Sequence, residues 1–371
     1  MRIHTTLIVT TLLGLSLITG GCATDRQVIQ QAAGMHNQLE PAVIEDPELA
    51  GYLQAVGDRV IESAKELSRQ GYGPKSHQAE KSEWMFGEQM KFHFVNSKTL
   101  NAFTTGGQHM YLYTQLFQEA RTEDELAAVM AHEFAHIYAR HVGKGMDRQY
   151  TALAAAAALG GAGYVAGGKE RGGQYAALGA TAGMLGGQFI NMGFTRKDEN
   201  EADELGFAFY TRAGWDPDRF ADFFQNMIDK GLDTTPELVS DHPSLKNRVA
   251  DTRKRVVNLP PNASEWRRPP VANAAKFKAL QARAAELGKT LPNDQSIANS
   301  QQLLQALPRS CVFPYVPEDE VQAREAIVKR AEAAQQQQQQ QQQQRPAQRP
   351  AGKQSRATTP PQQQVISSPR R

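Results

Sequence analysis

Two histidines and a glutamate stand close together in the segment His132-Glu133-Phe134-Ala135-His136. On a helix, residues four apart lie on one face, so the imidazoles of His132 and His136 can bind the same zinc ion. Glu133 lies beside them and can act as a general base toward a water molecule held there. The segment therefore predicts a zinc site that activates water for hydrolysis, and the alternative is a polar helix with surface histidines.

A third metal ligand must come from elsewhere in the chain. A catalytic zinc ion usually has three protein ligands and one position for water. Val142 stands six residues after His136, where an extended motif would have its third histidine. We expect His141 to point away from the metal, because on a continuous helix it lies about 140° around the axis from His136.

Four glutamates further along the chain are candidates for this ligand: Glu170, Glu199, Glu201 and Glu204. Only Glu199 has an aspartate, Asp203, four residues later. That spacing places a ligand and an acceptor for a histidine N–H on one helix face. We therefore expect Glu199 to be the third ligand and Asp203 to orient a ligand histidine. The alternative is that both are solvated helix residues.

The elements that must position these residues are mostly helices. Thr122 and Glu125 form a capping box before the helix of the two histidines, which is expected to run to about His141. An earlier helix begins at Asp46-Pro47, because aspartate is a favourable N-cap and proline suits the first turn. Further helices are expected at about 197–212, 217–230 and 244–257.

A small sheet is expected between the first two helices. Residues 90–96 alternate between polar and apolar side chains, which is typical of a strand. Residues 102–113 have the pattern of a hairpin or a bulged sheet edge. The expected fold class is therefore α+β and mainly α, with a small antiparallel sheet and an active-site helix that carries the two histidines.

Three segments together resemble one group of zinc metallopeptidases: residues 132–136, Glu199-Asn200-Glu201-Ala202-Asp203 and Asp241-His242-Pro243-Ser244. That group includes the CAAX prenyl endopeptidase, the heat-shock membrane protease HtpX and periplasmic outer-membrane quality-control proteases. Leu100-Asn101-Ala102-Phe103 with Gly107, and residues 213–217, match it as well. The resemblance covers about residues 40–258 and implies a zincin-type metallopeptidase domain with one zinc ion per chain.

The resemblance also implies roles for residues outside the metal-binding set. An edge strand would pair with the extended backbone of a substrate, with an ordinary hairpin as the alternative. Its residues here would be Asn101, Ala102 and Phe103. His242 would lie near the metal, where it stabilises the oxyanion or serves as a removable fourth ligand. Arg248 would orient Glu199 or bind a substrate carbonyl.

The N-terminal residues have the pattern of a processed signal. A basic start, a short apolar stretch and small residues extend over residues 1–21, as in a signal peptide. Cys22 follows directly and resembles the lipidation site of a bacterial lipoprotein, while the alternative is ordinary cleavage that leaves a free cysteine. Ala23 comes next, which by resemblance to lipoproteins indicates the outer membrane. We expect residues 22–40 to be the lipid anchor and a linker.

Composition divides the rest of the chain. A zinc metallopeptidase domain is expected over residues 41–258, and its glycine- and alanine-rich segment 151–193 is interpreted as a helical hairpin rather than as membrane spans. Residues 259–332 are expected to form a small helical region. Residues 333–371 contain an unbroken glutamine run and a basic end, which predicts a disordered tail.

Charge and cysteine content exclude several functions. The 41 basic and 39 acidic side chains of this 371-residue chain give a net charge of +2, which argues against a general nucleic-acid binder. Its two cysteines cannot form a disulfide framework or a four-cysteine zinc site.

These observations together predict a lipid-anchored zinc endopeptidase on the periplasmic side of the bacterial envelope. Its expected substrates are unfolded or misassembled envelope proteins, and its expected partners are the membrane, through Cys22, and an outer-membrane assembly machinery. One alternative is a latent protease, closed by His242, that acts mainly as a chaperone or assembly factor for outer-membrane proteins. Another is a cell-wall scaffold that works through its tail.

Overall fold

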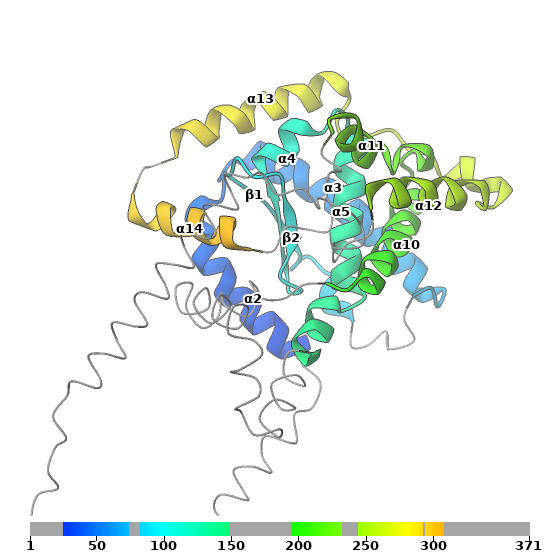
Figure 1. The fold of residues 1–371 in the computed structure, drawn as a ribbon, viewed down its shortest axis with the longest axis horizontal. Helices are drawn as coiled ribbons and strands as arrows, with labels where there is room; N and C mark the ends of the chain where they lie inside the picture. The colour runs from blue at the N-terminus through cyan, green and yellow to red at the C-terminus, as the bar shows by residue number, and fades with distance from the viewer. Residues whose placement is uncertain (1–24, 74–81, 149–193, 232–243, 292–293, 308–371) are drawn as a thin grey trace, which may run out of the picture. The chain divides into compact units, whose positions relative to one another are not determined.

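A three-stranded sheet lies between two groups of helices (Figure 1). The computed structural model describes residues 25–73, 82–148, 194–231, 244–291 and 294–307. The chain divides into two units, residues 1–332 and 333–371, and every described residue belongs to the first. The strands are β1 (Lys91–Val95), β2 (Ala102–Thr104) and β3 (His109–Tyr113). The helices are α2 (Asp25–Leu39), α3 (Pro47–Arg69), α4 (Thr114–Glu119), α5 (Glu123–Tyr138), α10 (Arg196–Arg212), α11 (Asp222–Asp229), α12 (Leu245–Val257), α13 (Ala274–Thr290) and α14 (Gln295–Ala306).

The sheet is mixed, with the strand order β1-β3-β2. Strands β2 and β3 form the expected antiparallel hairpin, whose turn contains Gly106 at a φ of 75°. Strand β1 pairs with the other side of β3 in a parallel register. The connection from β1 crosses to the far side of β3 before β2 begins, so β1 and β3 run in the same direction. The α+β, mainly helical fold class is confirmed, and the sheet differs from the expected one in this parallel pair.

The two faces of the sheet belong to two separate apolar clusters. Phe92 and Phe94 of β1 pair with Met110 and Leu112 of β3, and all four enter the main core with α3, α4 and α5. Alternate residues of the same strands point to the opposite face, where α2 and α14 cover them. The hydroxyl of Tyr113 donates to the carbonyl of Leu304 there, over 2.9 Å.

Helix α2 was missed in the sequence analysis, which assigned residues 22–40 to an anchor and linker. Residues 25–39 are helical because Val28, Ala32, Met35 and Leu39 repeat at three-to-four spacing and bury one face on the sheet. A wholly polar linker would not show this pattern.

Helices α13 and α14 pack on the domain that precedes them. Glu123, at the start of α5, accepts hydrogen bonds from the backbone N–H groups of Val271 and Ala272, each over 2.6 Å. Ser300 of α14 donates to the carbonyl of Gln38 at the end of α2. The described part of the region 259–332 therefore extends the fold of the domain that precedes it.

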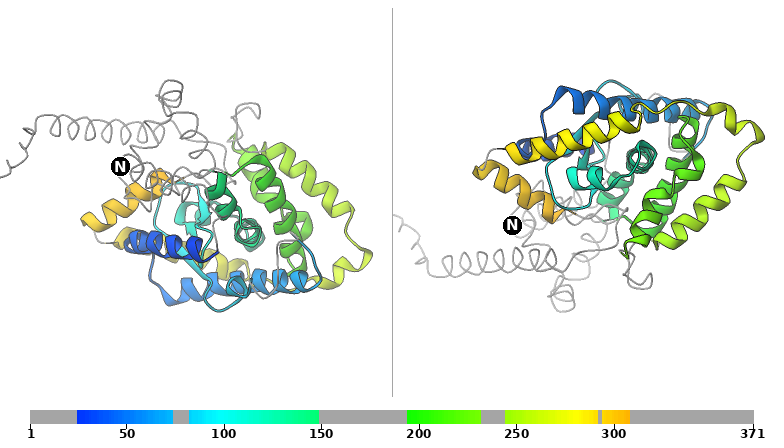
Figure 2. Two further views of the ribbon diagram at one scale, coloured as in Figure 1. Left: turned by 90° about the horizontal axis from the view of Figure 1, so that it is seen from below. Right: turned by 90° about the horizontal axis from the view of Figure 1, so that it is seen from above.

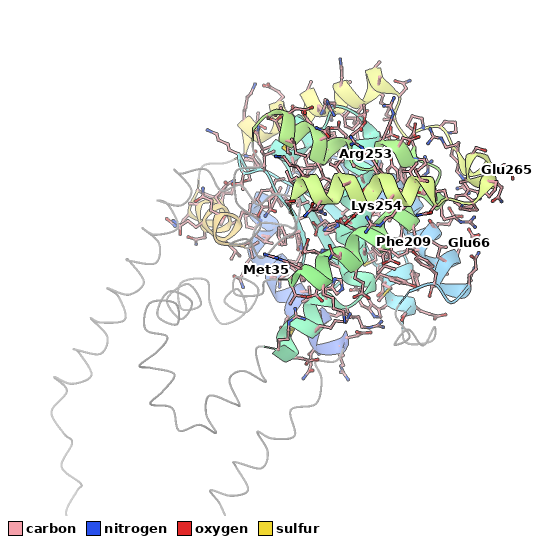
Figure 3. All side chains as sticks on the ribbon, turned by 45° about the vertical axis from the view of Figure 1, so that its right-hand side comes forward. Met35, Glu66, Phe209, Arg253, Lys254 and Glu265 are labelled. Carbon is pink, nitrogen blue, oxygen red and sulfur yellow. The ribbon has the colours of Figure 1, made fainter. Side chains whose placement is uncertain are left out.

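Side-chain burial separates the inner faces of the helices from their outer faces. Figure 3 shows Phe209 of α10 inside the protein and Arg253 and Lys254 on the outer side of α12. None of the helices among the described residues combines the length and the apolar character needed to cross a membrane. The expected signal peptide, the segment 151–193 and the glutamine-rich tail lie outside the described residues.

Candidate metal centre

Helix α5 places His132 and His136 with their Nε2 atoms 3.1 Å apart. Both imidazoles are fully buried, as is nearly the whole helix around them. Thr122 caps the helix by accepting a hydrogen bond from the N–H of Glu125. The Glu125 carboxylate accepts from the N–H and guanidinium of Arg121 instead of completing the expected box with Thr122.

Helix α10 brings Glu199 to the same point. Its carboxylate oxygens lie 3.7 Å from Nε2 of His132 and 3.8 Å from Nε2 of His136, and the residue is fully buried. The three residues form a group whose ligand atoms all lie within 4.8 Å of one another. Two imidazole nitrogens and one carboxylate are a ligand set that catalytic zinc sites use. The residues present therefore fit a zinc ion.

The close approach of α10 to α5 depends on Gly206. A Cβ atom at this position would lie only 3.0 Å from the N and Cα of His132. Those neighbours are backbone atoms of a buried helix, so a side chain at this position would require the two helices to move apart. Glycine thus allows the two ligand-bearing helices to pack closely (Figure 2).

The other ring nitrogen of His132 contacts Asp203, one turn after Glu199 on α10. Its Nδ1 lies 2.9 Å from Oδ1 of Asp203. When Nε2 faces the metal site, the proton is on Nδ1, and Nδ1–H donates to this carboxylate. Burial alone would raise the pKa of Asp203, but the charge of Arg248 and the contact with His132 hold this pKa below its usual range.

Arg248 supports this contact from α12. Its Nε and Nη2 donate to the two carboxylate oxygens of Asp203 over 2.8 and 2.5 Å, and Nη2 lies 3.2 Å from Nδ1 of His132. The guanidinium also stacks on the ring of Phe224, 4.0 Å from its centre. We expected Arg248 to orient Glu199 or bind substrate. The structure places the Arg248 side chain, only 2% exposed, behind Asp203.

His136 has a matching partner that the sequence analysis placed wrongly. Nδ1 of His141 lies 2.9 Å from Nδ1 of His136, and Nε2 of His141 lies 3.1 Å from Oε2 of Glu201. The prediction that His141 points away assumed a continuous helix. Helix α5 ends at Tyr138, and Arg140 adopts a φ of 55°, so the chain changes direction before His141.

The contact between His141 and Glu201 gives Glu201 a role other than that of a metal ligand, the role for which the sequence analysis considered it. The hydrogen bond from His141 lowers the pKa of Glu201 to about 2, and Lys144 adds to the effect. Its carboxylate is therefore ionised at neutral pH and accepts the Nε2–H of His141. A chain of hydrogen bonds thus runs from His136 through His141 to Glu201.

The remaining predicted site residues fall into two groups. Glu133 is buried on α5 between the two histidines, at 1% exposure. Strand β2 is at an edge of the sheet and packs against α5. Ala102 and Phe103 of this strand are buried, as is Asn101 directly before it. His242 and Cys22 lie outside the described residues.

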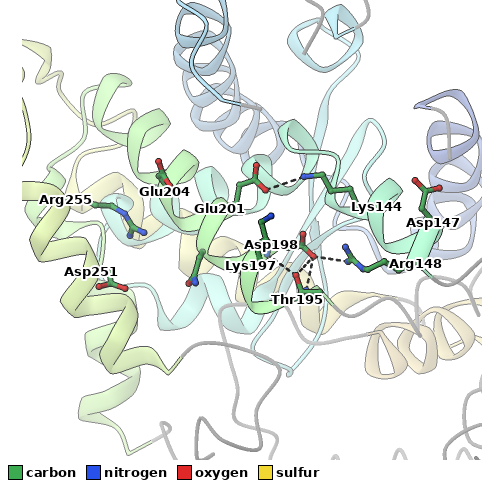
Figure 4. A pocket seen from close by; sticks show the side chains of 11 residues that line it. Lys144, Asp147, Arg148, Thr195, Lys197, Asp198, Glu201, Glu204, Asp251 and Arg255 are labelled. Carbon is green, nitrogen blue, oxygen red and sulfur yellow. Dashed lines mark hydrogen bonds and ion pairs between the residues drawn. The ribbon is translucent and has the colours of Figure 1, made fainter. Parts of the chain in front are cut away.

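A charged cavity of about 900 Å³ opens beside the metal centre (Figure 4). It is lined by Glu201 together with Lys144, Arg148 and Asp198, which form ion pairs across it. Burial opposes ionisation of Asp198, but backbone and hydroxyl donors of Thr195 and the charge of Arg148 lower its pKa. The lining does not include His132, His136 or Glu199.

A helix with two histidines and an intervening glutamate, completed by a glutamate from a second helix, defines the site of a metallopeptidase. The model of peptidase family M48 matches residues 76–256, and the chain carries a domain of this family. The family suspected from the sequence is thereby confirmed.

Several proteins with similar sequences are named as proteases. The chain is 33% identical over 223 residues to a putative beta-barrel assembly-enhancing protease of Vibrio cholerae and 30% identical over 225 residues to the beta-barrel assembly-enhancing protease of Escherichia coli. Each match covers 59% of this chain and 41% of the relative, so the matched part spans less than half of those proteins. The metalloprotease LoiP of Escherichia coli is 25% identical over 46% of this chain and 64% of its own length.

Proposed function

We propose that the chain is a zinc-dependent endopeptidase that hydrolyses peptide bonds of unfolded or misassembled cell-envelope proteins. The observation that carries the proposal is the convergence of His132, His136 and Glu199 on one buried point, with Glu133 on the same helix turn. The M48 domain supports peptide hydrolysis, because its match includes all four residues.

The chemistry divides between the metal and the side chains. A zinc ion held by His132, His136 and Glu199 would lower the pKa of water and polarise the carbonyl of the peptide bond. Glu133 accepts the proton of the attacking water and passes it to the departing amine. Asp203 holds His132 with Nε2 toward the metal site, and His141 holds His136 in the same way.

Strand β2 supports an extended substrate. It is the edge strand on the α5 side of the described sheet, so a substrate backbone added there would lie beside the helix of the two histidines. In this role Asn101, Ala102 and Phe103 position main chain and select little by side chain, as suits an enzyme for unfolded proteins.

The envelope location rests on the signal-like residues 1–21 and Cys22 and on the names of the beta-barrel assembly-enhancing relatives. A lipid at Cys22 would hold the enzyme on the periplasmic side of the outer membrane, near the outer-membrane assembly machinery. The relatives' names also favour a second candidate function. In it the protease is latent, with His242 as a removable ligand, and the protein assists the assembly of outer-membrane proteins.

Two glutamates of α10 provide the test. Glu199→Gln removes the proposed ligand, whereas Glu204→Gln changes an exposed residue of the same helix. We expect the first variant to lose zinc from the metal centre and to lose cleavage of an unfolded protein such as reduced casein. The second should retain both. Equal cleavage by both variants would refute the proposed metal centre, and zinc binding without cleavage by the parent would favour the latent form.

A further inference from the structure

Three histidines meet on the face of the sheet opposite the main core. His36 comes from α2, His93 from β1 and His109 from β3, and their ligand nitrogens lie within 4.8 Å of one another. His93 and His109 point to the same face, because β1 and β3 pair in parallel and the two residues occupy alternate positions in register. None of them belongs to the metal centre described above.

The distance between two of these nitrogens suits a shared metal ion. Nε2 of His93 lies 2.9 Å from Nδ1 of His109, compared with 3.1 Å between the Nε2 atoms of His132 and His136. Two imidazole nitrogens bound to one tetrahedral zinc ion at about 2.0 Å lie about 3.3 Å apart. A proton now joins His93 to His109, and a metal ion would take its place.

The third histidine is held by a contact on its other nitrogen. Nδ1 of His36 lies 3.0 Å from the hydroxyl of Tyr111, which leaves Nε2 as the ligand atom. Its ring stacks on that of His109 at 3.9 Å between centres and 13° between planes, so the His36 ring must turn out of this stack for its Nε2 to point at an ion shared with His109. Metal-binding histidines nearly always have such a partner on the nitrogen that does not bind the metal.

The three imidazoles are in the form that binds metals. Burial, with smaller effects of the neighbouring histidines and Lys91, lowers the pKa of His93 to about 3 and that of His109 to about 4. Burial also lowers the pKa of His36, against the opposing charge of Glu40. All three are therefore neutral at pH 7, so metal binding requires no net loss of a proton, and the proton shared by His93 and His109 shifts to the other nitrogen of its ring.

An ion can reach this cluster from solvent. Each histidine is only partly buried. His36 and His93 line a cavity of about 200 Å³ whose wall also contains Glu40 and Glu45, which attract cations. The cluster thus has neutral nitrogen ligands, an oriented ring and an entrance with negative charge.

We propose that His36, His93 and His109 form a second metal site, which binds a divalent transition-metal ion of the kind that imidazole prefers, zinc or copper. The ion would connect α2 to two strands of the sheet. Since α2 is the first described helix after Cys22, the site would fasten the N-terminal helix to the domain that carries the metal centre.

Metal content of the full-length protein tests the proposal, with zinc as the probe. We expect the parent to bind two zinc ions per chain. Each of three single variants should bind one: His93→Gln, His36→Gln and His132→Gln. The double variant His93→Gln/His132→Gln should bind none. Tyr111→Phe is the matched control, because it retains all three imidazoles and should still bind two ions, one of them at least tenfold more weakly.

A parent that binds one zinc ion, lost in His132→Gln and unchanged in His93→Gln and His36→Gln, would overturn the proposal. His36→Gln leaves the sheet intact, and circular dichroism identifies any variant that fails to fold. Copper gives a second readout in metal-free His132→Gln, where the three-histidine cluster is the remaining site: an electron paramagnetic resonance spectrum with nitrogen couplings from three ligands is expected, and one without them contradicts the site. His93→Gln should still cleave casein, so this outcome is independent of the peptidase test.

Discussion

Nδ1 of His141 lies 2.9 Å from Nδ1 of His136, although the two residues are five apart and stand on different helical segments. Together with the contact between His132 and Asp203, it gives each histidine of the metal centre its own partner. The partner of His132 is the carboxylate of Asp203 on α10. The partner of His136 is the imidazole of His141, which in turn contacts Glu201 on α10.

Replacing His141 by phenylalanine should therefore weaken zinc binding at the metal centre by about 10–100-fold, because His136 loses the group that fixes its ring. Competition with a chelator of known affinity measures this. His141→Asn, which retains a polar group near Nδ1, should recover part of the loss. An unchanged affinity in His141→Phe would show that Phe194, which stacks on His136 at 4.0 Å, is sufficient to hold the ring.

Replacing Arg248 by methionine should destabilise the metal-free protein by about 3–5 kcal/mol, because the buried carboxylate of Asp203 loses its bidentate partner. Urea unfolding in the presence of a chelator measures the free energy of unfolding. Arg253→Met changes an exposed residue of the same helix and should stay within about 0.5 kcal/mol of the parent. Similar losses in both variants would contradict the role given to Arg248.

Gly206→Ala should weaken zinc binding and lower stability together, since the added methyl group meets the backbone of His132 at 3.0 Å and separates α10 from α5. Gly51→Ala is the matched control, because a Cβ atom there meets nothing within 4 Å. That helix position should gain about 0.5–1 kcal/mol. Thermal unfolding of the two variants, measured with and without zinc, tests both expectations. A stabilised Gly206→Ala protein would be evidence against close packing of α10 on α5.

Stability should fall at acid pH partly through Asp46. The hydrogen bond from Arg283 lowers the pKa of this N-cap carboxyl to about 2, so its contribution is complete above its usual pKa of about 4 and is lost as the pH falls toward 2. Asn caps helices as well as Asp does, so Asp46→Asn should remove only the ion pair and lower the free energy of unfolding slightly at pH 7, since Arg283 is half exposed. Unfolding of both proteins between pH 7 and pH 3 should show this difference shrinking, and a constant difference would assign it to another cause.

Local patterns in the sequence were sufficient to predict that His132, His136 and Glu199 lie together, as they do in the structure. His132 and His136, and likewise Glu199 and Asp203, are four residues apart, and helical spacing alone places each pair on one face. The N-caps Asp46 and Thr122 were found for a similar reason, because a cap acts within three residues of the helix start.

What the sequence did not reveal depends on tertiary structure. The chain changes direction at Arg140, where the sequence has no glycine or proline to indicate a helix end. The position of His141 could therefore not be predicted. Arg248 reaches Asp203 from α12, which α11 separates from α10 along the chain, and no spacing rule covers such a pair. The three-histidine cluster likewise depends on the parallel pairing of β1 with β3, which local pattern does not specify.

The most direct test of the proposed peptidase is Glu133→Gln in the full-length protein, with zinc content and cleavage of reduced casein measured side by side. We predict that zinc stays bound, because the substitution leaves His132, His136 and Glu199 in place, while cleavage falls by about 10²–10⁴-fold. Cleavage at the parent rate with zinc still bound would contradict the assignment of Glu133 as the base and, with it, the proposed mechanism.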